Sequence, residues 1–237
     1  TDSIYRRVHH THFSGVDRYY MPFISPTMHR TLTRKEDRVL PRADSVGFSA
    51  IPQVLTKVTG DFLWAAEKCA ERGYSEINLN IGCPSGTVVS KGKGSGMLRN
   101  PDELDRFLDA VFAKSPLPIS VKTRLGLENP EEFPALLEVF NRYPITELTV
   151  HPRVRKDFYK EPMREEWFRY AYENSKAPLC YNGNLCTKGQ MNVVAENLCL
   201  IPAPLLYFRH PILFHLHFPC CNNCHICIGR PPLPRVR

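Results

Sequence analysis

A short apolar strand followed by polar residues is indicated by the stretch EINLNIGCP at residues 76–84. Glu76–Asn80 is short, contains isoleucine and leucine, and is followed by a glycine and a proline, as is typical of a buried parallel strand. Cys83 stands directly before Pro84, which disfavours helical backbone at Cys83. The stretch therefore predicts a strand whose carboxyl end presents Asn80 and Cys83.

A glycine-rich, cationic loop follows, with Lys91 and Lys93 in the run KGKGSG at residues 91–96. Two interpretations of this region stay open. In one, Cys83 is a buried structural cysteine and the two lysines are solvated. In the other, Cys83 is a thiol acid beneath a mobile loop that attracts phosphate.

Five further segments share the features of the first strand: Tyr19–Ser25, Ile51–Leu55, Pro118–Lys122, Thr146–Val150 and Pro178–Tyr181. Helical stretches alternate with them. Asn100-Pro101 and Asn129-Pro130 each combine a helix-capping residue with proline at the first helical position. Asp61 is expected to cap a helix over Phe62–Arg72 that ends at Gly73. Two more helices are expected over Asp2–His10 and Arg164–Asn174.

This alternation predicts an α/β fold with a parallel sheet and helical crossovers. A doubly wound sheet fits the alternation too, but polar residues recur at the strand ends, as in a (β/α)8 TIM-barrel fold, where these ends form one mouth. The strand-end residues are Gln53, Asn80, Cys83, Lys122, Arg124, His151, Arg153 and Asn182. Only six strands are recognised, with none before the first helix or after Leu185, so the barrel is expected to be incomplete.

The composition of the 237 residues is that of a globular protein, with 43% hydrophobic and 23% charged residues, which disfavours wholesale disorder. The formal net charge of +7 is compatible with a polyanionic partner such as nucleic acid. No signal peptide or membrane span is expected, because the most apolar stretch, Leu198–Phe218, is broken by prolines and charges. The scattered cysteines before residue 187 suit a reducing compartment, so a cytoplasmic location is expected.

The composition changes near residue 187, which predicts a division into residues 1–187 and an atypical tail, 188–237. The tail holds five of the nine cysteines and seven of the 21 prolines. A frameshift or a fragmentary gene model would explain this change. Alternatively, the C-x2-C-x2-C spacing of Cys221, Cys224 and Cys227 suits zinc or an iron–sulfur cluster, although no second well-spaced pair accompanies it.

Four motifs in order on consecutive strand ends resemble the flavin-dependent tRNA-dihydrouridine synthases: Asn80–Pro84, Val121–Gly126, His151–Arg153 and Asn182–Asn184. The similarity runs from Thr1 to about Leu185. The run YMPFISPT at residues 20–27 resembles a bacterial branch of this family. The tail does not resemble the family's last strand or its helical domain, and Gly229-Arg230 stands before a proline pair that is unsuited to a phosphate site.

The resemblance implies reduction of the C5–C6 bond of uridine in tRNA, with FMN as cofactor and NADPH as reductant. It implies that Cys83 is the catalytic acid that protonates C5. An ordinary thiol, with a pKa of about 8.5, is mostly protonated at neutral pH and suits this role. The position of the target uridine and the choice between NADPH and NADH stay open.

The remaining roles implied by the resemblance are cofactor binding and substrate binding. The residues for FMN are Gln53, Lys122, His151, Asn182, Gly183 and Asn184, the last standing where the family usually has aspartate. The residues for the RNA are Asn80, Lys91, Lys93, Arg124 and Arg153. No metal is expected at this site, and the chain is expected to be a monomer. Two alternatives remain: a flavin oxidoreductase acting on a free pyrimidine, and a non-catalytic remnant whose tail binds RNA or metal.

Overall fold

The computed structural model describes residues 3–13, 16–27, 29–185, 187, 189–190, 194, 215–217 and 225–227. Six parallel strands lie side by side in chain order: β1 (Arg18–Ile24), β2 (Ala50–Val54), β3 (Ile77–Asn80), β4 (Ile119–Arg124), β5 (Leu148–His151) and β6 (Leu179–Tyr181). The six strands expected from the sequence are confirmed, with bounds that differ by at most two residues.

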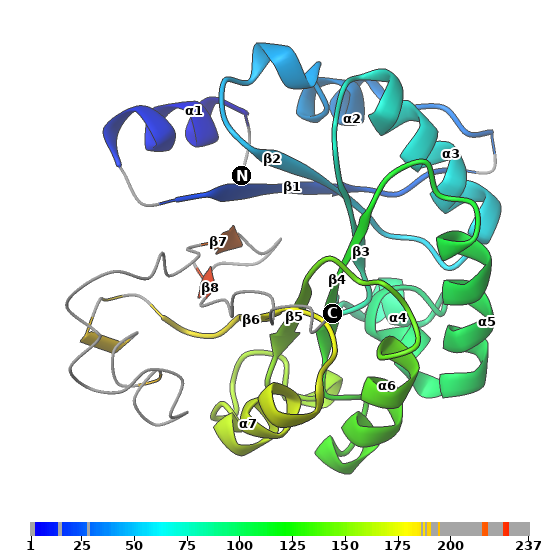
Figure 1. The fold of residues 1–237 in the computed structure, drawn as a ribbon, viewed down its shortest axis with the longest axis vertical. Coiled ribbons are helices and arrows are strands. Elements are labelled where there is room, and N and C mark those ends of the chain that lie inside the picture. Colours follow the sequence, from blue (N-terminus) through cyan, green and yellow to red (C-terminus); the bar gives the residue numbers. More distant parts are fainter. Residues whose placement is uncertain are drawn as a thin grey trace, which may run out of the picture.

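Helices connect these strands and lie on their outer side (Figure 1). They are α1 (Ser3–His12), α2 (Arg34–Val39), α3 (Thr59–Glu71), α4 (Gly86–Val89), α5 (Pro101–Phe112), α6 (Phe133–Phe140) and α7 (Glu165–Asn174). Short 3₁₀ turns are η1 (Ala43–Ser45), η2 (Gly94–Arg99), η3 (Pro130–Glu132) and η4 (Arg155–Asp157). Helix α3 lies next to α5, α5 next to α6, and α6 next to α7, which is the outer ring of a TIM-type barrel.

Two short strands of the tail extend the sheet beyond β1. Strand β7 (His215–His217) pairs in parallel with β1, and β8 (His225–Cys227) pairs antiparallel with β7. Strand β8 also lies beside β6, so the row of strands curves round and its two edges meet (Figure 1). The six parallel strands still make an incomplete (β/α) barrel, as expected, and the sequence analysis had not recognised these two short strands after Leu185. A three-residue strand carries too little periodicity to be recognised, and β1 offers it an unpaired edge.

The proposed division at residue 187 stays a prediction. The side chains of the C-x2-C-x2-C run and the Gly229-Arg230 pair lie outside the described residues. Elsewhere in the described part of the chain, no cluster of histidine, cysteine and acidic side chains has the arrangement of a metal site. No helix in that part is long and apolar enough to cross a membrane.

Helix boundaries follow the capping signals with one exception. Asn100 Oδ1 accepts hydrogen bonds from the N–H groups of Asp102 and Glu103 at the start of α5, as expected. Gly73, with φ of +83°, follows the end of α3. The expected cap at Asp61 is wrong: α3 begins two residues earlier, at Thr59, and the Asp61 carboxylate pairs with Arg30 at 3.7 Å. The Asp61 carboxylate, which the sequence predicted as a helix cap, instead pairs with an arginine outside the helix.

Alternation along the strands separates an apolar outer layer from a polar interior. Ile77 and Leu79 of β3 are buried in the hydrophobic core with the helices, whereas Asn78 and Asn80 belong to the opposite face. Asn78 Nδ2 donates to Ser120 Oγ of β4 at 3.0 Å inside this face. The two-residue period therefore directs the polar strand-end residues into the barrel rather than towards the helices.

Candidate active site

Strand register brings the expected site residues to one end of the barrel. Asn80 is paired with Lys122 across β3 and β4, and Arg124 is paired with His151 across β4 and β5. Gln53 of β2 pairs with Asn78. Because these strands are parallel, their carboxyl ends lie together and the polar side chains beyond them share one mouth.

Asn80 organises the turn that carries Cys83. Its Oδ1 accepts hydrogen bonds from the N–H groups of Gly82 and Cys83, both at 3.1 Å. Its Nδ2 donates to Gln53 Oε1 at 2.7 Å, which ties the ends of β3 and β2 together. Both side chains are buried, so this amide network holds the backbone of Cys83 in a defined position.

The loop that contains η2 holds Cys83 from the other side. The Ser95 N–H and hydroxyl both donate to Cys83 O, at 3.0 and 2.9 Å. Gly94 adopts φ of +58°, and a Cβ there would lie 2.8 Å from Cys83 O. Only glycine fits such a position. Cys83 is a free, half-buried thiol between two fixed backbone segments, with its carbonyl immobilised.

The Arg124 side chain is buried and bonds to backbone carbonyls of two loops. Nε donates to Gly82 O at 3.0 Å, and Nη1 donates to Val154 O and Phe158 O at 3.0 and 2.9 Å. The guanidinium lies 5.2 Å from the ring centre of Tyr159, and burial lowers the pKa of Arg124. Its role as a uracil contact stays a prediction, and its Nε and Nη1 connect the loops that follow β3 and β5.

His151, Arg153 and Asn182 form a buried cluster, and the exposed Asn184 lies at its edge. Arg153 Nη1 lies 3.2 Å from His151 Nε2 and 3.4 Å from Asn184 Oδ1. A guanidinium only donates, so His151 Nε2 accepts and its proton lies on Nδ1. His151 Nδ1 then donates to Asn182 Oδ1 at 3.2 Å. This leaves Asn182 Nδ2, a buried donor with no partner among the described residues.

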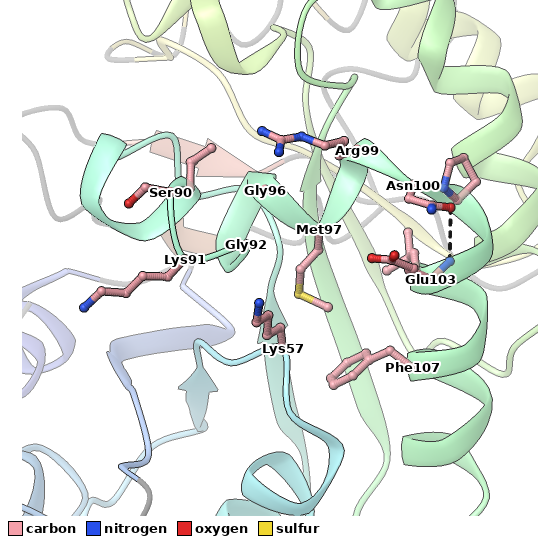
Figure 2. A pocket seen from close by; sticks show the side chains of 13 residues that line it. Lys57, Ser90, Lys91, Gly92, Gly96, Met97, Arg99, Asn100, Glu103 and Phe107 are labelled. Atoms are coloured by element: carbon pink, nitrogen blue, oxygen red, sulfur yellow. Dashed lines mark hydrogen bonds between the residues drawn. The ribbon is translucent and has the colours of Figure 1, made fainter.

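Lys91 and Lys93 lie away from this cluster, on the loop between α4 and η2. Lys93 Nζ donates to Ser25 Oγ at 3.3 Å, which connects the loop to the end of β1. Lys91 is exposed and lines two adjoining pockets of about 610 and 640 Å³. Figure 2 shows the first pocket, with Lys57 and Met97 extending into its centre.

A family model described as dihydrouridine synthase (Dus) matches residues 1–198. The chain belongs to the dihydrouridine synthase family. Its incomplete (β/α) barrel is consistent with the TIM-barrel fold of that family.

Relatives of this dihydrouridine synthase chain match over shorter stretches. A "probable tRNA-dihydrouridine synthase" of Staphylococcus aureus strain Mu50 is 41% identical over 91 residues, which cover 38% of this chain and 27% of the relative. A "tRNA-dihydrouridine(16) synthase" of Vibrio parahaemolyticus is 33% identical over 128 residues, 52% of this chain and 40% of the relative. The matched region thus spans between about a quarter and two fifths of these relatives.

The buried cluster of the dihydrouridine synthase barrel fits a flavin. The pyrimidine edge of a flavin presents carbonyl oxygens and a ring nitrogen, which call for donors. Asn182 Nδ2 is such a donor, buried and without a partner in the described part of the chain, and a buried polar group of this kind is costly unless a ligand satisfies it. Lys122 on β4 and Gln53 on β2 flank β3, the strand that carries Asn80. The donor set present therefore suits FMN.

Gly183 has a packing role in addition to its expected backbone contact with phosphate. A Cβ there would lie 2.4 Å from the Tyr181 ring and 2.6 Å from Met163 Cε, so a larger residue would have to displace these two side chains. Lys57 and Arg99 line the first pocket and were not expected there from the sequence. Lys57 follows the end of β2 closely, so the strand-end criterion that found Gln53 could also have found Lys57.

Proposed function

We propose that this chain contains the catalytic barrel of an FMN-dependent tRNA-dihydrouridine synthase that reduces the C5–C6 bond of uridine with NADPH as reductant. The observation that carries the proposal is the position of Cys83. Its backbone is held by Asn80 on one side and by Ser95 on the other, with the thiol left half-buried at the barrel mouth. A fixed thiol that remains accessible suits proton donation to a substrate carbon.

FMN, when bound, supplies the hydride that reaches C6 of the uracil. Cys83 then delivers its proton to C5: the S–H bond breaks, the C5–H bond forms and the resulting thiolate regains a proton from solvent. Asn80 and Ser95 keep Cys83 from moving during this transfer, which favours reaction by orientation. The target base must leave its stack to reach a thiol at the bottom of the mouth.

The other chain residues hold the cofactor and the substrate. Asn182 Nδ2, Gln53 and Lys122 would donate to the flavin edge, and the His151–Arg153 pair fixes the orientation of Asn182. Arg124 connects the Cys83 turn to the loop after β5, so it would keep both walls of the uracil pocket in place. The tRNA partner, the monomeric state and the cytoplasmic location remain predictions.

The test compares Cys83→Ala with wild type, using unmodified tRNA, FMN and NADPH. We expect both proteins to bind FMN at near one per chain by visible absorption. Dihydrouridine formation is expected to fall by about 100-fold or more in the variant, the usual contribution of a positioned acid. Cys180→Ala is the control, because Cys180 is buried in β6.

Two results would contradict the proposal: undiminished dihydrouridine formation by Cys83→Ala, or a wild-type chain that cannot be loaded with FMN. Free uridine and uracil serve as substrates in parallel. Reduction of these at the rate found for tRNA would favour the alternative, an oxidoreductase acting on a free pyrimidine.

A further inference from the structure

The first pocket beside the Cys83 loop is lined by cationic side chains. Lys57 follows β2, Lys91 follows α4 and Arg99 ends η2, so three separate segments each contribute one positive charge around a cavity of about 610 Å³ (Figure 2). The fourth wall is the first turn of α5, where Asn100 caps the helix. All three cations are exposed and reach solvent.

These charges are not compensated locally. Within the part of the chain that the structure describes, Lys57, Lys91 and Arg99 form no ion pair, although seven other cations do. Glu103 is the one acidic residue among those lining the pocket. The pocket therefore has an excess of positive charge, which favours an anionic ligand.

A second pocket of about 640 Å³ adjoins the first and shares Lys91 with it. Its lining includes Arg30 and Lys93, with Asp61 paired to Arg30 at 3.7 Å. We call the five cations that line the two pockets the basic track; its members are Arg30, Lys93, Lys91, Lys57 and Arg99. Two adjoining pockets suit several phosphates in succession better than one small anion.

The loop that lines the first pocket of the basic track also contacts Cys83. Gly92 and Gly96 line the first pocket, and between them Gly94 and Ser95 pack on and hydrogen-bond to Cys83. A ligand held in the pocket would thus lie against the loop that fixes the proposed acid. An RNA strand that delivers one base to Cys83 must continue on both sides of it, with a phosphate at every nucleotide.

We propose that the basic track binds consecutive backbone phosphates of the RNA strand next to the target uridine, and that Lys57 and Arg99 hold one of these phosphates in the first pocket. This inference rests on the proposed function and adds three residues, Arg30, Lys57 and Arg99, to the substrate contacts. Phosphate contacts position the strand and carry no sequence preference.

The test measures binding of unmodified tRNA to the full chain over a range of salt concentrations. Removing the cation that neutralises one phosphate should reduce the slope of log K against log[salt] by about 0.7 to 0.9. We expect this reduction and a several-fold higher Kd for Lys57→Ala and for Arg99→Ala, whereas Lys57→Arg should retain the wild-type slope. Lys114→Ala is the matched control, because Lys114 is an exposed cation just beyond the other end of α5.

The outcomes separate this inference from the proposed function. Slopes that match wild type in both alanine variants would overturn the phosphate site while leaving uridine reduction untouched. A rise in the KM for NADPH without a change in tRNA binding would overturn the assignment to RNA and assign the pocket to the reductant's phosphate. Slopes reduced as expected in a protein that forms no dihydrouridine would support the basic track and contradict the proposed function.

Discussion

Tyr20 Oη donates a hydrogen bond to Glu147 Oε1 at 2.8 Å. Tyr20 lies on β1 and Glu147 directly precedes β5, two strands separated by three others in the sheet. The bond therefore crosses the interior, which is possible because the sheet is curled. Thr149 Oγ1 donates to the same carboxylate oxygen at 3.2 Å. Burial, followed by the negative charge of Glu147, raises the pKa of Tyr20 well above its usual range. The hydroxyl therefore remains a donor.

Breaking this cross-barrel bond should destabilise the fold. Tyr20→Phe is expected to cost about 1–3 kcal/mol in the free energy of unfolding, because it leaves a buried carboxylate less well satisfied. A double-mutant cycle with Glu147→Gln in urea should give a coupling energy of about 0.5–3 kcal/mol. Tyr170→Phe is the control for removal of a tyrosine hydroxyl. A coupling energy near zero would show that the bond does not stabilise the barrel.

Alkaline pH should destabilise the protein partly through Cys69, which is fully buried on α3. Burial raises the pKa of the Cys69 thiol from 9.0 to about 12. The folded state therefore keeps the proton longer than the unfolded state, so this contribution is complete below about pH 9 and is lost as pH rises towards 12.

The corresponding measurement is the free energy of unfolding of wild type and Cys69→Ala as a function of pH. Wild type should lose up to about 1.4 kcal/mol more per pH unit than the variant above pH 9. The small cavity left by alanine shifts the whole curve without changing its slope. Parallel curves for the two proteins would refute the assignment to Cys69.

Asn80 should act as a positioning residue for Cys83. Asn80→Ala removes the acceptor of the Gly82 and Cys83 N–H groups, so the turn should loosen. Displacement of the thiol by about 1 Å is expected to lower kcat for tRNA reduction by about 100-fold. The rate of Cys83 alkylation by iodoacetamide should rise at the same time.

Asn78→Ala provides the comparison for Asn80→Ala. Asn78 lies on the same strand and the same inward face, and bonds to Ser120 instead of to the Cys83 turn. Removing its side chain should reduce stability without changing the alkylation rate. If both variants altered alkylation and kcat equally, Asn80 would have only a general structural role.

Glycine should give a more stable protein than alanine at position 158. The φ of +50° at Phe158 is in a region that residues with a Cβ rarely adopt, and the residue is 41% exposed. Strain of about 1–3 kcal/mol at such a residue exceeds the roughly 0.5–1 kcal/mol that glycine costs in backbone entropy. Phe158→Gly is thus expected to be more stable than Phe158→Ala, which also lacks the ring, by about 1 kcal/mol in thermal or urea unfolding. Equal stability would show that the conformation is unstrained.

The order of strands and helices could be predicted from the sequence because the signals are local. Ile77 and Leu79 alternate with Asn78 and Asn80, and Asn100-Pro101 marks a helix start wherever the helix lies in the fold. The same alternation places Asn80, Lys122 and His151 on inward faces, so the mouth residues could be found without knowing their partners. Recognition of the family rests on these same strand ends.

The partners themselves depend on which segments the curled sheet brings together, and no local pattern encodes that. Asp61 has the composition of a helix cap, but Arg30 lies within reach and pairs with it. The substrate role of Arg124 stays a prediction, but the sequence did not show that its Nε and Nη1 donate to the carbonyls of Gly82, Val154 and Phe158. Lys57 and Arg99 are 42 residues apart in the chain and line one pocket. Side-chain hydrogen bonds and ion pairs require contact within a few ångströms, and only the closure of the barrel determines which residues achieve it.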